Sequence, residues 1–181
     1  REQKNPFLPF GKKGFLFKKQ NMVYIVMGVI GAGKTTIGRL LAKRLGIEFR
    51  DADDYHTECN IKKMRDGIPL TDEDRKPWIF AIRSVIDAQL ALGKDCVIAC
   101  SALKDKYRKT LIQERKEIIL VYLKGDIDII RERIKSRTGH FASTALLENQ
   151  FEVLEEPENA LVVDIRKTPD EIVDEILKIT E

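Results

Sequence analysis

The segment Gly28–Thr35 reads Gly-Val-Ile-Gly-Ala-Gly-Lys-Thr and matches the pattern GxxxxGK[ST] at every fixed position. Glycines allow the backbone N–H groups of such a loop to curl around phosphate oxygens, and the positive end of a following helix strengthens the attraction. In this pattern Lys34 reaches the β and γ phosphates, and the hydroxyl of Thr35 binds Mg²⁺. The segment therefore predicts a nucleoside-triphosphate site, with a ligand-free glycine-rich turn as the alternative. The predicted nucleotide contacts here are Gly28, Gly31, Ala32, Gly33, Lys34, Thr35 and Thr36.

Two features of other phosphate-loop proteins are missing from the sequence. The guanine-specifying pattern Asn-Lys-x-Asp does not occur, and its nearest approach, Leu123–Asp126, lacks the asparagine. The apolar run Val97–Cys100 continues into Ser101–Lys104 without the acid that usually completes a magnesium site. A GTPase switch is therefore disfavoured, and the metal shell must be completed from another strand or through water.

Acidic residues follow a second strand-like pattern that begins at Ile47. Asp51 and Asp53 are two positions apart, so their side chains face the same side if the strand persists through both. Ligands of open α/β sheets bind at the carboxyl ends of strands, and phosphoryl transfer to an alcohol needs a carboxylate near the attacking hydroxyl. An acidic loop that only caps the next helix explains the spacing equally well. The phosphate loop favours the functional interpretation.

The stretch from Thr71 to Trp78 combines a helix start with a candidate binding residue. Thr71 followed by three acids is typical of a helix N-terminus, and Trp78 begins an apolar face. Arg75 has no equally simple structural role, because an arginine here can make a bidentate contact with an acidic substrate.

These residues must be positioned by alternating strands and helices. The apolar run Val23–Met27 precedes the phosphate loop, and a helical pattern follows it up to Gly46. Further strand-like runs are Val97–Cys100, Ile118–Leu123 and Leu161–Ile165, and helical patterns cover 78–92, 104–113, 127–135, 145–154 and 170–179. Buried strands separated by helices predict an α/β fold with a mainly parallel sheet covered on both faces.

Length, charge and cysteine content limit the function classes. The chain of 181 residues fits one domain and has no apolar run long enough to cross a bilayer. Residues 1–21 carry a net charge of +5 and residues 22–181 carry −2, so the body does not have the charge of a polyanion binder. We predict an extension outside the fold at 1–21, either introduced or translated from upstream, and a single domain at 22–181. Three cysteines without a CxxC pair predict a reducing, intracellular setting.

Several stretches together resemble the gluconokinases, phosphate-loop kinases related in fold to shikimate and nucleoside monophosphate kinases. The resemblance covers residues 23 to about 175 and rests on the phosphate loop and on the stretches Asp51–Asp53, His56, Asn60–Met64, Gly67–Leu70, Asp72–Trp78, Cys100–Lys104, Tyr107–Arg108, Tyr122–Gly125, Arg137–Phe141, Gln150–Glu152 and Leu154–Pro157. It implies a three-layer P-loop NTPase sandwich with a five-stranded sheet, like that of nucleoside monophosphate kinases, and with a lid.

The resemblance also implies an activity, namely transfer of the γ-phosphate of ATP to the 6-hydroxyl of D-gluconate with Mg²⁺ as cofactor. By similarity Thr35 and Asp51 hold the metal, and Asp53 is the candidate general base. His56, Arg75 and Lys104 are placed for the acid sugar together with Asp53, His140 and Gln150. A carboxylate with a chain of hydroxyls requires both cationic and hydrogen-bonding partners, which this set supplies.

The basic segment at 131–141 resembles the lid of these kinases. Arginines brought in as a lid closes can stabilise charge on the transferring phosphoryl group, so we predict that Arg133 and Arg137 contact ATP and that Arg137 is catalytic with Lys34. The alternative is a solvated basic helix end. The resemblance further suggests a homodimer. The cysteines predict a cytoplasmic location, and the charge of the body and the lack of a long apolar run argue against nucleic-acid and membrane partners.

Two other interpretations of the function stay open at this point. One is a shikimate-like or nucleotide kinase, against which the stretches 56–63 and 72–78 argue. The other is a nucleotide-dependent binding module that uses the basic N-terminal segment as an arm.

Overall fold

The fold was obtained as a computed structural model that describes residues 21–136 and 144–180. Within these residues five strands form one wholly parallel sheet in the order β2-β3-β1-β4-β5. The strands are β1 (Val23–Met27), β2 (Glu48–Asp51), β3 (Cys96–Ala99), β4 (Ile118–Lys124) and β5 (Leu161–Asp164). The helices are α1 (Lys34–Leu45), the 3₁₀ helix η1 (Ala52–Tyr55), α2 (Glu58–Arg65), α3 (Asp72–Ala91), α4 (Asp105–Ile112), α5 (Ile127–Lys135), α6 (Thr144–Glu152) and α7 (Pro169–Thr180).

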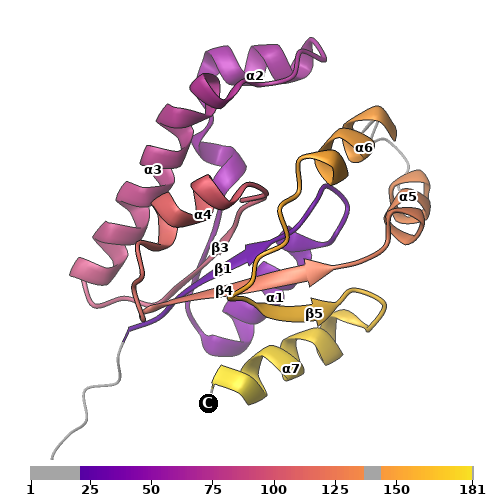
Figure 1. The fold of residues 1–181 in the computed structure, drawn as a ribbon. Helices are drawn as coiled ribbons and strands as arrows, with labels where there is room; N and C mark the ends of the chain where they lie inside the picture. The colour runs from indigo at the N-terminus through magenta and orange to yellow at the C-terminus, as the bar shows by residue number, and fades with distance from the viewer. Residues whose placement is uncertain (1–20, 137–143, 181) are drawn as a thin grey trace, which may run out of the picture.

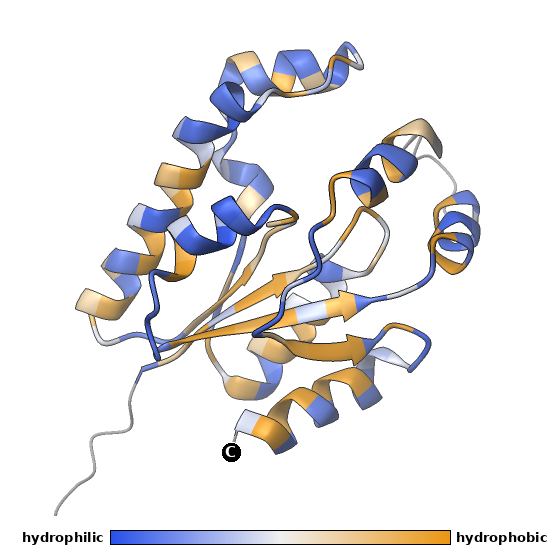
Figure 2. Cartoon of the chain, in the orientation of Figure 1, coloured by the Kyte–Doolittle hydropathy of each residue, from blue (hydrophilic) through white to orange (hydrophobic). Residues whose placement is uncertain are grey.

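The sheet lies between two helical layers, with α3 and α4 on one face and α1 and α7 on the other (Figure 1). Alternate side chains of β1 therefore enter two different cores. Ile25 packs with α3 and α4, whereas Val26 packs with α1 and α7. The central strands β1, β3 and β4 are mainly apolar and buried, whereas the edge strand β2 is mostly polar, and the helices are polar on their outer faces (Figure 2). This is the pattern expected of a parallel sheet buried on both sides.

Helix ends are set by local sequence signals. Gly46 ends α1 in a left-handed conformation, with its N–H donating to the carbonyls of the last turn. Thr71 and Asp74 form a reciprocal capping box at the start of α3. The helix therefore begins at Asp72, six residues before the apolar face at Trp78 that marks its core side.

Two short elements were not predicted, namely η1 and α2. The condition under which Asp51 and Asp53 would share one side of a strand is not met, because β2 ends at Asp51 and η1 follows at once. The Asp51 carboxylate accepts the N–H of Asp53 and so caps the 3₁₀ turn. Asn60 and Lys63 then join α2 to α3 through the backbone and side-chain oxygens of Asp74.

Buried arginines fix α4 against its neighbours. Arg83 of α3 donates to the carbonyls of Thr110 and Leu111 at the end of α4. Arg108 donates to the carbonyls of Ala102 and Leu103, and so holds the loop between β3 and α4. None of the described helices is both long and apolar enough to span a bilayer.

Candidate active site

The phosphate loop joins β1 to the first turn of α1 at the carboxyl edge of the sheet. Gly33 caps α1 in a left-handed conformation with φ 102°, and no side chain caps the first N–H groups of the helix. These N–H groups and the helix dipole make this end a site for an anion. Gly31 has φ 79°, and an added Cβ would lie 2.8 Å from Cγ1 of Ile134, so α5 packs directly on the loop.

Lys34 folds back over this loop. Its Nζ donates to the carbonyl of Val29 at 3.1 Å. Burial lowers the pKa of Lys34, while the nearby carboxylates of Asp53 and Asp51 act in the opposite direction. A half-buried ammonium beside N–H groups that no side chain caps is a strong electrostatic site for the phosphates of a nucleotide.

Asp51, the last residue of β2, contacts the hydroxyl at the end of the phosphate loop. The hydroxyl of Thr35 donates to Oδ2 of Asp51 at 2.9 Å. Parallel pairing places Asp51 opposite Ala99 of β3, one residue before Cys100. Burial raises the pKa of the Cys100 thiol to about 12, so that neighbouring position carries a neutral group.

A hydroxyl and a carboxylate on adjacent elements suit Mg²⁺. This ion uses one or two protein carboxylates and takes its remaining ligands from substrate phosphates and water. The described residues contain no cluster of three or more His, Cys, Asp or Glu that could enclose a metal. The pair Thr35 and Asp51 therefore fits a magnesium ion that arrives with a nucleotide, not a closed protein cage.

Asp53 follows Asp51 by two residues and lies in η1. Asp53 is exposed as a residue, but partial burial of its carboxylate raises the pKa of Asp53, and the charge of Asp51 adds to this, while Lys34 and His56 oppose it. A carboxylate whose pKa is raised accepts a proton more readily at neutral pH than an ordinary one does.

His56 and Trp78 form the wall beside Asp53. Their rings stack with centroids 4.7 Å apart and an angle of 6° between planes. Trp78 Nε1 donates to the carbonyl of Ala52 at 2.7 Å, which anchors η1 on α3. Burial lowers the pKa of His56, the charge of Asp53 acts in the opposite direction, and the charge of Arg75 adds to the lowering. The Nδ1 atom of His56 is buried without a hydrogen-bond partner among the described residues.

A cavity of about 310 Å³ opens next to this wall, between the start of α3, the β3–α4 loop and α6. Its lining residues are Pro69, Leu70, Thr71, Asp72, Arg75, Trp78, Ser101, Leu103, Lys104, Tyr107, Leu146, Asn149, Gln150 and Val153. Backbone, hydroxyl, amide and cationic groups share the wall with apolar side chains. This mixture suits a small polar molecule.

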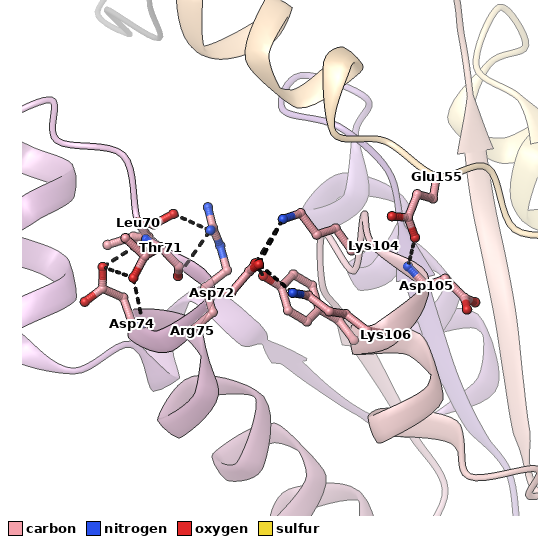
Figure 3. Close-up of polar contacts among 10 residues, drawn as sticks. Leu70, Thr71, Asp72, Asp74, Arg75, Lys104, Asp105, Lys106 and Glu155 are labelled. Atoms are coloured by element: carbon pink, nitrogen blue, oxygen red, sulfur yellow. Dashed lines mark hydrogen bonds and ion pairs between the residues drawn. The ribbon is translucent and has the colours of Figure 1, made fainter.

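Asp72 organises one end of the cavity (Figure 3). Lys104 donates to it at 3.0 Å, and Lys106 and the hydroxyl of Tyr107 also donate to it. The contacts with Lys106, Tyr107 and Lys104 hold the pKa of Asp72 well below its usual range. Lys104 therefore reaches the cavity already paired with an acid.

Arg75 differs from Lys104 in this respect. Its guanidinium donates to the carbonyls of Leu70 and Thr71 (Figure 3). Among the described residues it forms no ion pair, and the nearby carboxylates of Asp72 and Asp74 pair with lysines. Backbone carbonyls orient this side chain but do not neutralise its charge. The cavity therefore contains one positive group that is available for an anionic ligand.

Comparison with known proteins identifies the family. Residues 30–181 match the sequence profile of the family described as shikimate kinase. A probable gluconokinase of Mus musculus is 43% identical over 176 residues, which cover 86% of this chain and 96% of the mouse protein. The thermoresistant gluconokinase of Escherichia coli strain K12 is 44% identical over 147 residues, which cover 79% of this chain and 84% of that protein. The crystal structure of a gluconokinase from Sinorhizobium meliloti 1021 has a TM-score of 0.78 at 39% identity, and the match covers 88% of this chain and 90% of that one.

The chain belongs to the gluconokinase family. Membership in this family makes it a kinase that uses ATP and transfers a phosphoryl group to an alcohol. The family resemblance and the P-loop α/β fold with a five-stranded parallel sheet are confirmed.

The gluconokinase-family fold brings most of the predicted site residues to one edge of the sheet. Arg75, Lys104 and Gln150 line the cavity, and His56 supports it through Trp78. Thr36 is exposed in the first turn of α1. Gln150 also contacts the phosphate loop, because its Oε1 accepts the N–H of Ile30 at 2.7 Å.

The lid arginines are placed differently. Arg133 lies half-buried in α5 and donates to the carbonyl of Ile165. Arg137 and His140 lie outside the described residues. Their predicted roles stay predictions.

Asp72 and Tyr107 are cavity residues to which the sequence assigned no role in the site. Asp72 occupies a first-turn position where an acid is common, so its sequence signal is that of a helix start. Its contact with Lys104 joins residues 32 positions apart, and only the packing of α3 against α4 brings them together.

Proposed function

We propose that this gluconokinase-family protein transfers the γ-phosphoryl group of ATP to the 6-hydroxyl of D-gluconate. The observation that carries the substrate class is Arg75, a cation in the cavity without a carboxylate partner among the described residues. A sugar acid supplies the missing negative charge, and its hydroxyls match the polar side chains of the wall.

Asp53 is the group that receives the proton in this proposal. The 6-hydroxyl oxygen attacks the γ-phosphorus as its proton passes to the Asp53 carboxylate, the bond from the γ-phosphorus to the bridging oxygen breaks, and ADP leaves. The raised pKa of Asp53 supports this role, because a general base works best when its pKa approaches the working pH.

Lys34 and the N–H groups of the phosphate loop bind the negative charge of the β and γ phosphates. Thr35 and Asp51 would hold Mg²⁺, which would supply further neutralisation of the phosphate charge. Arg137, from the part of the chain that is not described, is our candidate for a further positive charge, and Arg133 for a second. A homodimer remains an expectation from the family resemblance, and a cytoplasmic location remains an expectation from the cysteine content.

The test is ADP formation from ATP and Mg²⁺ with D-gluconate, shikimate, AMP or CMP offered separately. Stimulation by gluconate alone is expected, with loss of turnover in Lys34→Ala and Asp53→Asn. Turnover on another acceptor with no response to gluconate would overturn the substrate assignment and leave the fold unaffected.

Arg75→Met tests the basis of this assignment. Loss of a charge-assisted hydrogen bond of about 1.5–3 kcal/mol predicts a rise of about 10–100-fold in the KM for gluconate, with the KM for ATP nearly unchanged. Lys76→Met is the matched control, since Lys76 is the next residue of α3, is exposed and, among the residues that the structure describes, pairs only with Glu73. An equal rise in both variants would remove Arg75 from the proposed carboxylate site.

A further inference from the structure

One hydrogen bond joins the wall of the acceptor cavity to the phosphate loop. Oε1 of Gln150, on α6, accepts the N–H of Ile30 at 2.7 Å across a sequence separation of 120 residues. Gln150 also lines the cavity. A single side chain thus contacts both halves of the site.

The chemistry of this bond orients the amide of Gln150. A backbone N–H can only donate, so the atom that faces Ile30 must be the carbonyl oxygen Oε1. The Nε2 group is then left with two N–H donors, and no residue of the described chain accepts from it. Because Gln150 is half-buried at the cavity wall, an acceptor substrate is the natural partner for these donors.

Core packing holds α6 in this position. Leu147, one turn before Gln150, is completely buried in the same apolar cluster as Val29 and Ala32 of the phosphate loop. The face of α6 that carries both residues therefore rests on the loop. A displacement of α6 would act directly on the loop backbone.

The position of Lys34 indicates which part of a bound nucleotide would lie near the contact between Gln150 and Ile30. Its Nζ, the group that serves the β and γ phosphates in such loops, donates to Val29, the neighbour of Ile30. Gln150 therefore contacts the loop at the end where the transferred phosphate and the acceptor must meet.

We propose that Gln150 is a two-sided positioning residue, whose Oε1 holds the phosphate loop at Ile30 while its Nε2 donates to the bound acceptor. This inference rests on the proposed function for the identity of the acceptor. It has a thermodynamic consequence. A substrate that fixes Gln150 also fixes the loop, so gluconate and nucleotide strengthen each other's binding by the same factor.

Two variants separate the two contacts of Gln150. Gln150→Glu keeps an oxygen for the N–H of Ile30 but replaces the donor with a carboxylate. Gln150→Ala removes both contacts. Glu152→Ala is the matched control, because Glu152 is exposed on the same helix and has no recorded side-chain contact in the described chain. Thermal melts followed by circular dichroism establish that each variant is folded.

The measurement is the affinity for the β,γ-imido analogue of ATP with Mg²⁺, by calorimetry, with and without D-gluconate. In the unaltered protein we expect gluconate to tighten nucleotide binding at least about fivefold, the lower end of usual coupling between sites. In Gln150→Glu the affinity for nucleotide alone stays within about threefold, whereas the coupling disappears and the KM for gluconate rises about tenfold or more. In Gln150→Ala both the affinity and the coupling fall.

The outcomes distinguish this inference from the proposed function. An unaltered protein that does not phosphorylate gluconate contradicts the proposed function. If the unaltered protein phosphorylates gluconate and the folded Gln150 variants keep its coupling factor and its KM within twofold, the proposed role of Gln150 is overturned and the proposed function stands. Absence of any coupling in the active, unaltered protein overturns it as well.

Discussion

The contact between Trp78 and Ala52 offers a direct test of how the core supports the site. Trp78 Nε1 donates to the carbonyl of Ala52 in a fully buried position, and the indole ring stacks on His56. Ala52 opens the 3₁₀ turn that carries Asp53. Trp78→Phe keeps an aromatic ring for the stack but removes the hydrogen-bond donor.

The expected loss of stability has two parts. Leaving the carbonyl of Ala52 unpaired costs about 1–3 kcal/mol, because a buried acceptor loses its partner and gains no water. The smaller ring leaves a cavity that costs about another 1 kcal/mol. The sum of about 2–4 kcal/mol is a large part of the free energy of unfolding of an ordinary domain, which is about 5–15 kcal/mol.

Thermal and chemical denaturation measure this cost. In a chain of this length 1 kcal/mol corresponds to about 2–4 °C, so Tm should fall by about 5–15 °C. Turnover of the folded variant should also fall, with little change in the KM for ATP, because η1 loses its anchor while the phosphate loop does not. Phe80→Ala is the control, since Phe80 is on the same helix but 61% exposed, and its cost should stay near 0.5 kcal/mol. Equal effects of the two substitutions, or an unchanged Tm in Trp78→Phe, would refute the reasoning.

Three further predictions concern the carboxylates and the loop. The raised pKa of Asp53 means that the folded chain keeps this proton to a higher pH than the unfolded chain does, so stability falls as pH rises between the two pKa values. Asp53→Asn should therefore raise Tm at pH 7, while turnover drops by about 100-fold or more. The gain in Tm should shrink as the pH is lowered through the range between the two pKa values. A variant whose Tm at pH 7 stays below that of the unaltered protein contradicts this prediction. Asp51→Asn should raise the Mg²⁺ concentration for half-maximal turnover by about 10–100-fold, as expected for groups that support a metal site, whereas a titration of the exposed neighbour variant Asp54→Asn should match the unaltered protein. Gly31→Ala should lower the free energy of unfolding in urea by about 1–3 kcal/mol more than Gly46→Ala, because both glycines have positive φ but only Gly31 lies against Ile134; equal costs would show that this packing is not tight.

Local patterns in the sequence were enough to predict much of this protein. The phosphate loop is recognisable because its function requires glycines, Lys34 and Thr35 at fixed spacing within one continuous segment. The central strands are recognisable because burial on both faces demands uninterrupted apolar runs such as Val23–Met27. Arg75 was predicted as a binding residue because its charge had no simple structural role at a helix start.

Tertiary structure decided which of these residues meet. Asp51 contacts Thr35 because β2 ends at Asp51, where a side-chain cap turns the chain into η1, an outcome that alternation of residues could not foresee. Asp72 takes Lys104 as its partner only because α3 packs beside α4.

The contact between Gln150 and Ile30 best shows which features the local sequence determines and which depend on tertiary packing. The sequence determined the type of each element and the chemical groups that it carries, because propensity, capping and phosphate binding act over a few neighbouring residues. The packing of Leu147 into the core is what brings α6 onto the loop, across 120 residues. Such contacts depend on how buried faces fit together in three dimensions, and no local pattern of residues encodes that fit by itself.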